Sequence, residues 1–131
     1  MKVRCENENV ILSEVRCLSL PLTLDCGEAF RWQCEEDGSW SGAAYGKFLN
    51  IKEENGEFVL KNTSLEDFEC VWRNYFDLDR DYAAICDRLK EDSLLSETID
   101  EYYGIRILNQ DPWEALVSFI ISQQNNIKRI K

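Results

Sequence analysis

Residues 40–62, WSGAAYGKFLNIKEENGEFVLKN, decide the fold of this 131-residue chain. Apolar and polar residues alternate on both sides of Asn55-Gly56, and an Asn-Gly pair between two such runs is the strongest short-range signal for a β-hairpin. We therefore expect residues 40–52 and 56–62 to form antiparallel strands.

The same kind of pattern continues toward the N-terminus. Residues 10–24 (VILSEVRCLSLPLTL) and 30–34 (FRWQC) are rich in β-branched and aromatic residues, which favour strands. Glu36-Asp37-Gly38 marks a turn before Trp40. Strand-like structure joined by antiparallel hairpins is therefore predicted from Val10 to about Leu60.

After Lys61 the apolar spacing changes from two residues to three and four, which predicts amphipathic helices. Ser64 and Asp67 stand where a helix N-terminus needs capping groups. A second helix is expected within residues 78–92, and a third within residues 93–104 that stops at Gly104. Because a run of strands precedes a run of helices, the predicted fold class is α+β. The apolar positions of the first helix are Leu65, Phe68, Val71, Trp72, Tyr75 and Phe76.

The last predicted helix begins with Asp111 as its cap and Pro112 at its first position. Its apolar residues spread around most of its circumference, and such a helix is usually buried in a larger body. We therefore expect this chain to expose an apolar patch and to self-associate through its last helix. The apolar residues are Trp113, Ala115, Leu116, Val117, Phe119, Ile120 and Ile121.

The composition is that of one folded domain, since 44% of the residues are apolar and 11% aromatic. No run of eighteen apolar residues is present, and the start, MKVRCENENVIL, lacks the features of a signal peptide. We expect a protein that is cytoplasmic, or nuclear in a eukaryote, and neither secreted nor in contact with a membrane.

Six cysteines and no histidine restrict the possible chemistry. No two cysteines have the C-x-x-C spacing of a metal site, so we expect free thiols that are mostly small core residues, and no bound metal. The lack of histidine removes the side chain most often used as a general base. Any catalysis by this chain would therefore need a lysine, a carboxylate or a thiolate. The cysteines are Cys5, Cys17, Cys26, Cys34, Cys70 and Cys86.

The charge is unevenly distributed along the chain. A formal net charge of −10 argues against an ordinary nucleic-acid binder, whose footprint is basic. From Ser118 onward, however, there is no acidic residue, whereas Lys128, Arg129 and Lys131 are basic. The C-terminal end is therefore electrically unlike the rest.

Three segments together resemble the N-terminal part of 8-oxoguanine DNA glycosylase, an enzyme of base-excision DNA repair. They are residues 22–32 (LTLDCGEAFRW), 75–82 (YFDLDRDY) and 104–130 (GIRILNQDPWEALVSFIISQQNNIKRI). The resemblance implies a twisted antiparallel sheet domain, similar to the TATA-binding-protein half-fold, over residues 1–110. Residues 111–131 would then be the first helix of the helix-hairpin-helix glycosylase domain.

The resemblance also implies roles for particular residues in binding double-stranded DNA that contains 8-oxoguanine opposite cytosine. Gly27 matches the glycine whose carbonyl accepts a hydrogen bond from the N7–H of the lesion. Gln124, Asn125 and Asn126 match an asparagine triplet that enters the gap left by the flipped base. Arg129 matches an arginine that reads the opposite cytosine; Gln124 departs from the family pattern, which puts strict cytosine preference in doubt.

The family uses no metal or cofactor, and its catalytic lysine and aspartate lie beyond the matched segments. Lys128 and Lys131 are not substitutes, so the parent protein is expected to be a DNA glycosylase and AP lyase, while this chain alone is expected to be inactive. Two alternatives stay open. One is a protein-interaction domain without enzymatic activity, and the other is part of an alkylpurine DNA glycosylase of the same superfamily.

Overall fold

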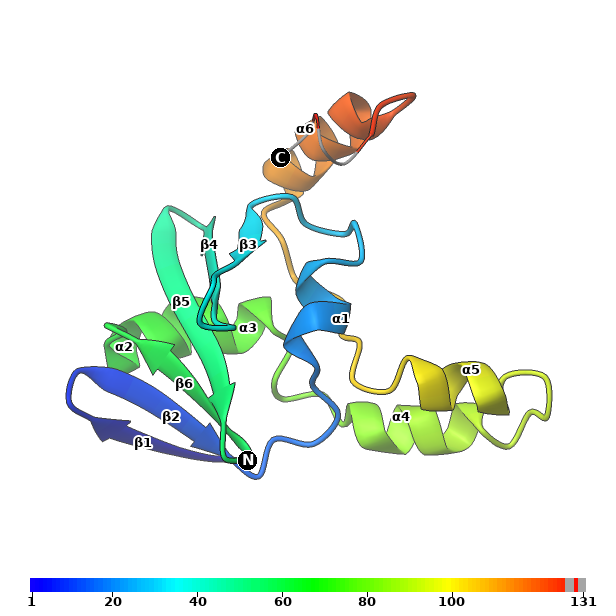
Figure 1. Cartoon of the computed structure of the whole chain (residues 1–131), viewed down its shortest axis with the longest axis horizontal. Helices are drawn as coiled ribbons and strands as arrows, with labels where there is room; N and C mark the ends of the chain where they lie inside the picture. Colours follow the sequence, from blue (N-terminus) through cyan, green and yellow to red (C-terminus); the bar gives the residue numbers. More distant parts are fainter. Residues whose placement is uncertain (127–128, 130–131) are drawn as a thin grey trace.

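The computed structural model describes residues 1–126 and residue 129. Its centre is a six-stranded antiparallel sheet with the strand order β1-β2-β6-β5-β4-β3 (Figure 1). Helices pack on one face of the sheet and beside it, so the predicted α+β class is confirmed. The strands are β1 (Lys2–Glu6), β2 (Asn9–Ser13), β3 (Trp32–Cys34), β4 (Trp40–Ala44), β5 (Lys47–Glu54) and β6 (Glu57–Lys61).

Tight two-residue turns join the central strands. Asn55 and Gly56 connect β5 to β6 with φ values of 52° and 77°, so the predicted Asn-Gly hairpin is confirmed. The prediction of one strand over residues 40–52 is wrong, because the chain turns back at Tyr45-Gly46, with φ values of 50° and 72°. Two positive φ angles match the twist of antiparallel strands, and Gly46 adopts one without strain.

The prediction of strand structure throughout residues 10–24 is also wrong. Strand β2 ends at Ser13, and helix α1 (Leu20–Leu24) follows. The Ser19 hydroxyl caps this helix by accepting from the Leu22 N–H at 3.5 Å, and Pro21 occupies the first turn. Local capping thus overrides the strand tendency of the apolar residues. Strand β1, which pairs with β2, was not predicted.

The first predicted helix covers the sheet as three consecutive pieces. They are α2 (Leu65–Asp67), the π-helical turn η1 (Phe68–Trp72) and α3 (Arg73–Tyr75). The Ser64 hydroxyl accepts from the Asp67 N–H at 3.0 Å, which confirms the predicted cap.

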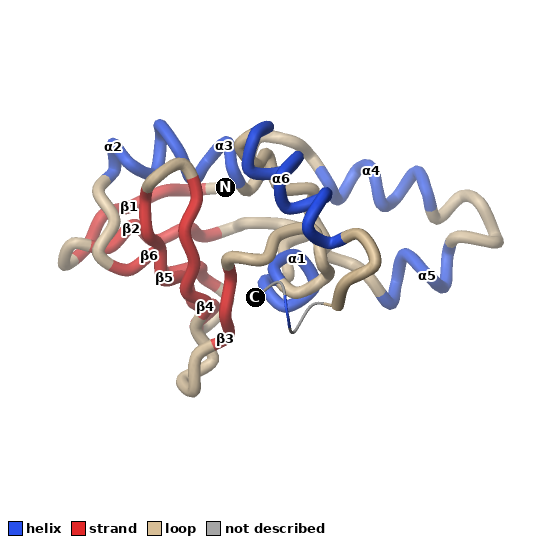
Figure 2. Tube along the Cα trace, turned by 90° about the horizontal axis from the view of Figure 1, so that it is seen from above, coloured by secondary structure: helices blue, strands red, loops and turns tan. Residues whose placement is uncertain are grey.

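The second and third predicted helices are α4 (Tyr82–Leu89) and α5 (Ser96–Glu101). Both views show them paired and extending away from the sheet (Figures 1 and 2). The prediction that the third helix stops at Gly104 is wrong by three residues, because α5 ends at Glu101 and Gly104, with a φ of 103°, lies in the turn that follows. Helix α6 (Pro112–Ser122) completes the described elements. None of the helices in the described part of the chain is long and apolar enough to cross a membrane.

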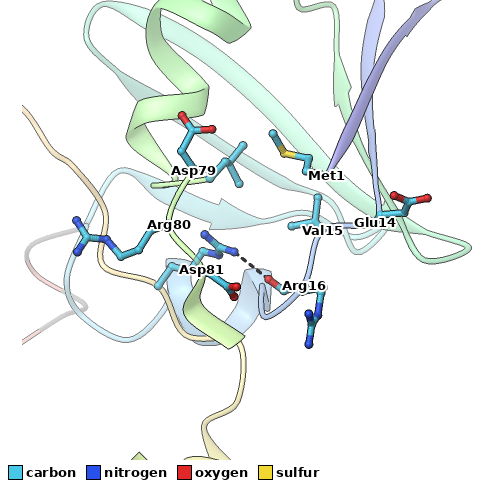
Figure 3. Close-up of a pocket in the computed structure, with 9 residues that line it drawn as sticks. Met1, Glu14, Val15, Arg16, Asp79, Arg80 and Asp81 are labelled. Carbon is cyan, nitrogen blue, oxygen red and sulfur yellow. Dashed lines mark hydrogen bonds between the residues drawn. The ribbon is translucent and has the colours of Figure 1, made fainter. Parts of the chain in front are cut away.

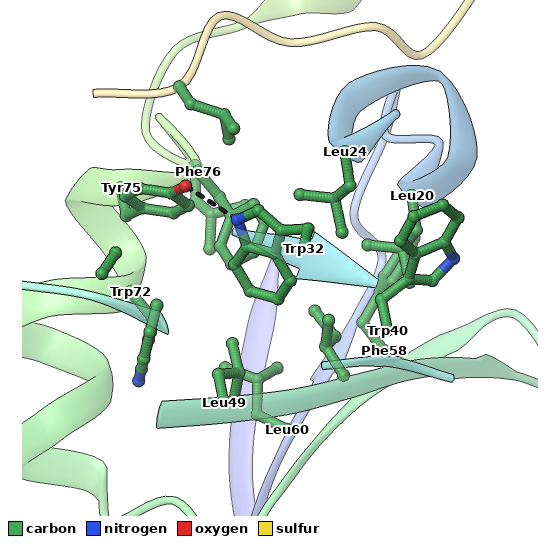
Figure 4. Close-up of a cluster of buried hydrophobic side chains, with 14 of the residues drawn as sticks. Leu20, Leu24, Trp32, Trp40, Leu49, Phe58, Leu60, Trp72, Tyr75 and Phe76 are labelled. Carbon is green, nitrogen blue, oxygen red and sulfur yellow. Dashed lines mark hydrogen bonds between the residues drawn. The ribbon is translucent and has the colours of Figure 1, made fainter. Parts of the chain in front are cut away.

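Trp32 lies at the centre of the core, between the sheet and the helical layer (Figure 4). Its indole N–H donates to the Tyr75 hydroxyl at 2.8 Å, and its ring packs against Trp72 and Phe76. Burial raises the pKa of Tyr75 to about 12, so the hydroxyl stays neutral. Gly42 pairs with Trp32 across β3 and β4, where a Cβ would collide with the indole ring.

The predicted apolar face of the first helix is confirmed for its aromatic residues and for Val71, which packs against the core, and is wrong for Leu65. Phe68, Trp72, Tyr75 and Phe76 are buried. Leu65 is exposed.

The prediction that the cysteines are mostly core residues is wrong, because most of them are exposed on edge strands, loops or helices. Cys5, Cys26, Cys34 and Cys70 are exposed, Cys86 is half-buried and Cys17 is buried.

A buried guanidinium joins segments that are far apart in the sequence. Arg106 is 3% exposed and donates to the carbonyls of Arg16 at 2.9 Å, Cys17 at 2.9 Å and Asp77 at 2.7 Å. The bond to Arg16 is drawn in Figure 3. The guanidinium also lies 4.5 Å from the centre of the Tyr82 ring. Burial lowers the pKa of Arg106, but the carbonyl dipoles and the ring face stabilise its positive charge.

Replacing Arg106 by methionine should lower the free energy of unfolding by about 3 kcal/mol, because three carbonyls would lose a charged donor. Chemical denaturation monitored by tryptophan fluorescence measures this loss. Arg88→Met, at an exposed position on α4, is the matched control and should change stability by less than about 0.5 kcal/mol. Equal effects of the two substitutions would contradict a central role for Arg106.

Candidate nucleic-acid interface

Gly27 lies in the loop of residues 25–31 that joins α1 to β3. Its φ is 89°, a conformation that residues with side chains rarely adopt, and a Cβ built on it would meet nothing within 4 Å. The glycine is therefore required by the backbone conformation, while the space beside it is open. A flat ligand could approach this backbone closely.

An extended segment, residues 104–110, ties α1 and the Gly27 loop together through alternate residues. The Gly104 carbonyl accepts from the Ser19 N–H at 2.8 Å. The Arg106 N–H donates to the Thr23 hydroxyl at 3.2 Å. We call residues 104–110 the strap.

Glu28, the residue after Gly27, holds the loop to the far end of the strap. Its carboxylate accepts from the Leu108 N–H at 2.8 Å, and its carbonyl accepts from the Gln110 side-chain amide at 2.8 Å. Burial raises the pKa of Glu28, although the hydrogen bond from Leu108 acts in the opposite direction. Glu28 was not predicted as a site residue, and no sequence pattern marks it as a partner of the strap.

An ion pair links the loop to α6 itself. Arg31 Nη1 lies 3.1 Å from Glu114 Oε2 in the first turn of the helix. Asp111 caps this helix by accepting from the N–H groups of Trp113 and Glu114, both at 3.0 Å, which confirms the predicted start. The Gly27 loop is therefore held to the strap by Glu28 and to the beginning of α6 by Arg31.

The predicted amides and Arg129 come together beyond the other end of α6. Gln124 has a φ of 54°, and Asn125 donates from its side chain to the Ile121 carbonyl at 3.3 Å. The Asn126 side-chain oxygen accepts from the Arg129 N–H at 3.2 Å. All four predicted residues are exposed. They form one polar turn, which we call the amide turn, whereas Lys128 and Lys131 lie outside the described residues.

The Gly27 loop contacts the first turn of α6 through Arg31, whereas the amide turn follows the last residue of this helix. The predicted residues therefore belong to separate segments on either side of α6 in the sequence. A partner that contacts both must reach from one segment to the other. Double-stranded DNA has the required length, and the amide turn offers hydrogen-bond donors and acceptors without added negative charge.

The cleft beside Arg106 lies apart from the predicted site residues. A cleft of about 200 Å³ near Arg106 is lined by charges of both signs and by none of the predicted site residues (Figure 3). In the described part of the chain, no three His, Cys, Asp or Glu side chains are placed to hold a metal ion.

Replacing Glu28 by alanine removes the acceptor of the Leu108 N–H. It should lower the free energy of unfolding by about 1–2 kcal/mol and speed amide hydrogen exchange in residues 25–31. Glu28→Gln keeps an oxygen acceptor and is the matched control. If the two variants lose stability equally and exchange alike, the hydrogen bond does not hold the loop.

The raised pKa of Glu28 also predicts a pH dependence. The stabilising contribution of its protonated form is complete below the unfolded pKa, near 4.5, and is lost as pH rises through the higher folded pKa. The stability of the wild type relative to Glu28→Gln should therefore be greater at about pH 4 than at about pH 7. Denaturation curves at both pH values measure the difference, and the opposite sign would contradict burial as the dominant effect.

Comparison with known proteins identifies the domain. The family model for the N-terminal domain of 8-oxoguanine DNA glycosylase matches residues 10–116. The N-glycosylase/DNA lyase OGG1 of Arabidopsis thaliana is 29% identical over 119 residues, covering 86% of this chain and 33% of the relative. The N-glycosylase/DNA lyase of Saccharomyces cerevisiae is 30% identical over 129 residues, covering 86% and 34%. The chain spans about a third of the length of these curated relatives.

Solved structures agree with the sequence matches. The structure of MBOgg1 in complex with a low affinity DNA ligand has a TM-score of 0.95 and 45% identity, covering 99% of this chain and 45% of that one. The Clostridium acetobutylicum 8-oxoguanine glycosylase/lyase, in complex with double-stranded DNA containing cytosine opposite 8-oxoguanine, has a TM-score of 0.95 and 40% identity, covering 100% and 45%. Because most of the chain matches the family model, it belongs to the 8-oxoguanine DNA glycosylase family and contains that family's N-terminal domain.

Proposed function

We propose that this chain is the lesion-recognition part of an 8-oxoguanine DNA glycosylase and AP lyase. Residues 1–110 would form the sheet domain, and residues 111–131 would begin the helix-hairpin-helix domain. The observation that carries the proposal is the fixed spatial relation between the Gly27 loop and α6, together with DNA-bound relatives of the same fold. The partner is a duplex with 8-oxoguanine opposite cytosine.

Gly27 would distinguish 8-oxoguanine from guanine. The lesion carries an N7–H that guanine lacks, and a backbone carbonyl can accept from it only if no side chain keeps the flat base away. The open space beside Gly27 and its φ of 89° support this role. Glu28 would set the position of the carbonyl by fixing the next residue to the strap.

The amide turn would occupy the space that the extruded base leaves in the duplex. Each amide carries a donor and an acceptor, so Gln124, Asn125 and Asn126 can replace lost base-pair hydrogen bonds. The exposed Arg129 guanidinium can donate two hydrogen bonds to the opposite cytosine and favours the approach of a polyanion. The longer side chain of Gln124 should make the preference for cytosine less strict.

Catalysis would require a lysine nucleophile and an aspartate from the helical domain. The lysine would attack the sugar carbon, release the base and allow β-elimination of the strand through a Schiff base. The chain alone is expected to release no base from an 8-oxoguanine·cytosine duplex. The same chain joined to the catalytic half of the Clostridium acetobutylicum relative should release it.

This comparison also tests the two other functions. Base release by the unjoined chain would overturn its proposed inactivity. Release of alkylated purines but not of 8-oxoguanine by the joined protein would favour the alkylpurine class. A folded joined protein, verified by circular dichroism, that acts on neither substrate would favour an interaction domain.

Gly27→Ala in the joined protein should reduce the preference for 8-oxoguanine over guanine by about tenfold, the equivalent of one lost hydrogen bond. Single-turnover base release from matched duplexes gives the ratio. Gly46→Ala, another positive-φ glycine but in the β4–β5 turn, controls for backbone strain alone. An unchanged ratio in Gly27→Ala would contradict the recognition role.

We also propose that this chain, tested alone, self-associates through α6. Trp113 is 72% exposed, and Phe119 and Ile120 are each 61% exposed. Light scattering should show a mass that rises with concentration, and Phe119→Lys with Ile120→Lys should restore the monomer. Leu94→Lys, at an 86% exposed position outside α6, should change nothing. A wild-type monomer at every concentration would contradict the proposal.

A further inference from the structure

Two cysteines that are distant in sequence meet beside the Arg106 site. The sulfur atoms of Cys17, in the loop before α1, and Cys86, on α4, lie 3.7 Å apart. Cys17 is 5% exposed, whereas Cys86 is half-buried and accessible from solvent. Tyr82 and Ala83 pack around the pair and form a small apolar cluster separate from the main core.

We propose that Cys17 and Cys86 are a covalent modification site that forms a reversible intrachain disulfide. Bonded sulfurs lie about 2.05 Å apart, so the two atoms must approach by roughly 1.7 Å. The Cys17 backbone is held by Arg106, which donates to its carbonyl at 2.9 Å. Rotation of the thiols and a small shift of α4, which extends from the sheet (Figure 1), bring the sulfurs together.

The oxidant is a hydroperoxide, and the chemistry proceeds in two balanced steps. The Cys86 thiolate attacks the peroxide, forming an S–O bond as the O–O bond breaks, and the alcohol or water leaves. The Cys17 thiolate then attacks the sulfenic sulfur, forming the S–S bond and releasing the hydroxyl as water. Two thiols thus lose two electrons and two protons, and a small dithiol reverses the reaction.

The disulfide would connect α4 to the segment that leads into the Gly27 loop. Cys17 precedes Ser19, the cap of α1, and α1 runs directly into residues 25–31. Cross-linking two positions 69 residues apart restricts the unfolded chain strongly and stabilises the folded one. The inference concerns this chain's own thiols and does not depend on the proposed function.

The test uses the chain with its four exposed cysteines, Cys5, Cys26, Cys34 and Cys70, replaced by serine, so that intermolecular disulfides do not form. After treatment with hydrogen peroxide, mass spectrometry without reductant should show a monomer lighter by two hydrogen atoms. Its proteolytic digest should contain a Cys17–Cys86 peptide. Thermal melting should rise by several degrees and return to its former value with dithiothreitol.

Cys86→Ser in the same background should abolish both the cross-linked peptide and the melting shift, and circular dichroism verifies that it folds. Two results would overturn the proposal. One is that an alkylating reagent, added after peroxide treatment and denaturation, still modifies both Cys17 and Cys86 completely. The other is oxidation of each cysteine to sulfinic acid with no linked peptide.

Discussion

The buried guanidinium of Arg106 is the interaction on which the arrangement of this domain depends. A charge in the interior is tolerated only when its donors are satisfied, and Arg106 meets this condition with three carbonyls from two segments. Because Arg106 belongs to the strap, its hydrogen bonds also hold residues 104–110 beside α1. The strap in turn holds the Gly27 loop through the hydrogen bond between Leu108 and Glu28. It leads directly into Asp111, which caps the first turn of α6.

The sheet serves mainly as a rigid base for this connection. Tight turns fix its register, and Trp32 links its edge strand to the helical layer through Tyr75. The loop of residues 25–31 enters β3 directly at Trp32, so one end of the loop is anchored in the core and the other in α1. A loop held at both ends and along its length loses little entropy when its backbone binds a ligand, which suits the role proposed for Gly27.

Much of this fold could be predicted from the sequence, because the signals were local. The Asn55-Gly56 turn, the Ser64 cap and the Asp111-Pro112 helix start each depend on neighbouring residues. Helix α1 was mistaken for a strand because its apolar residues favour both structures and only the Ser19 cap decides between them. The turn at Tyr45-Gly46 was missed because tyrosine rarely adopts a positive φ, as Tyr45 does here.

The candidate site was predictable only where a resemblance supplied the roles. Gly27, the three amides and Arg129 were named from matching motifs. Glu28 and Arg106, in contrast, act through contacts to residues far away in the sequence. Glu28 bonds to a residue 80 positions away, and Arg106 bonds to residues 89 and 29 positions away, so no local pattern marks either of them.

The central proposal is that this domain directs a lysine-dependent glycosylase to 8-oxoguanine. Borohydride trapping on an 8-oxoguanine·cytosine duplex, with the chain alone and joined to a relative's catalytic half, tests it most directly. We expect a covalent protein–DNA adduct from the joined protein only, and far less of it on a guanine·cytosine duplex; an adduct from the chain alone, or none from a folded joined protein, would contradict the claim.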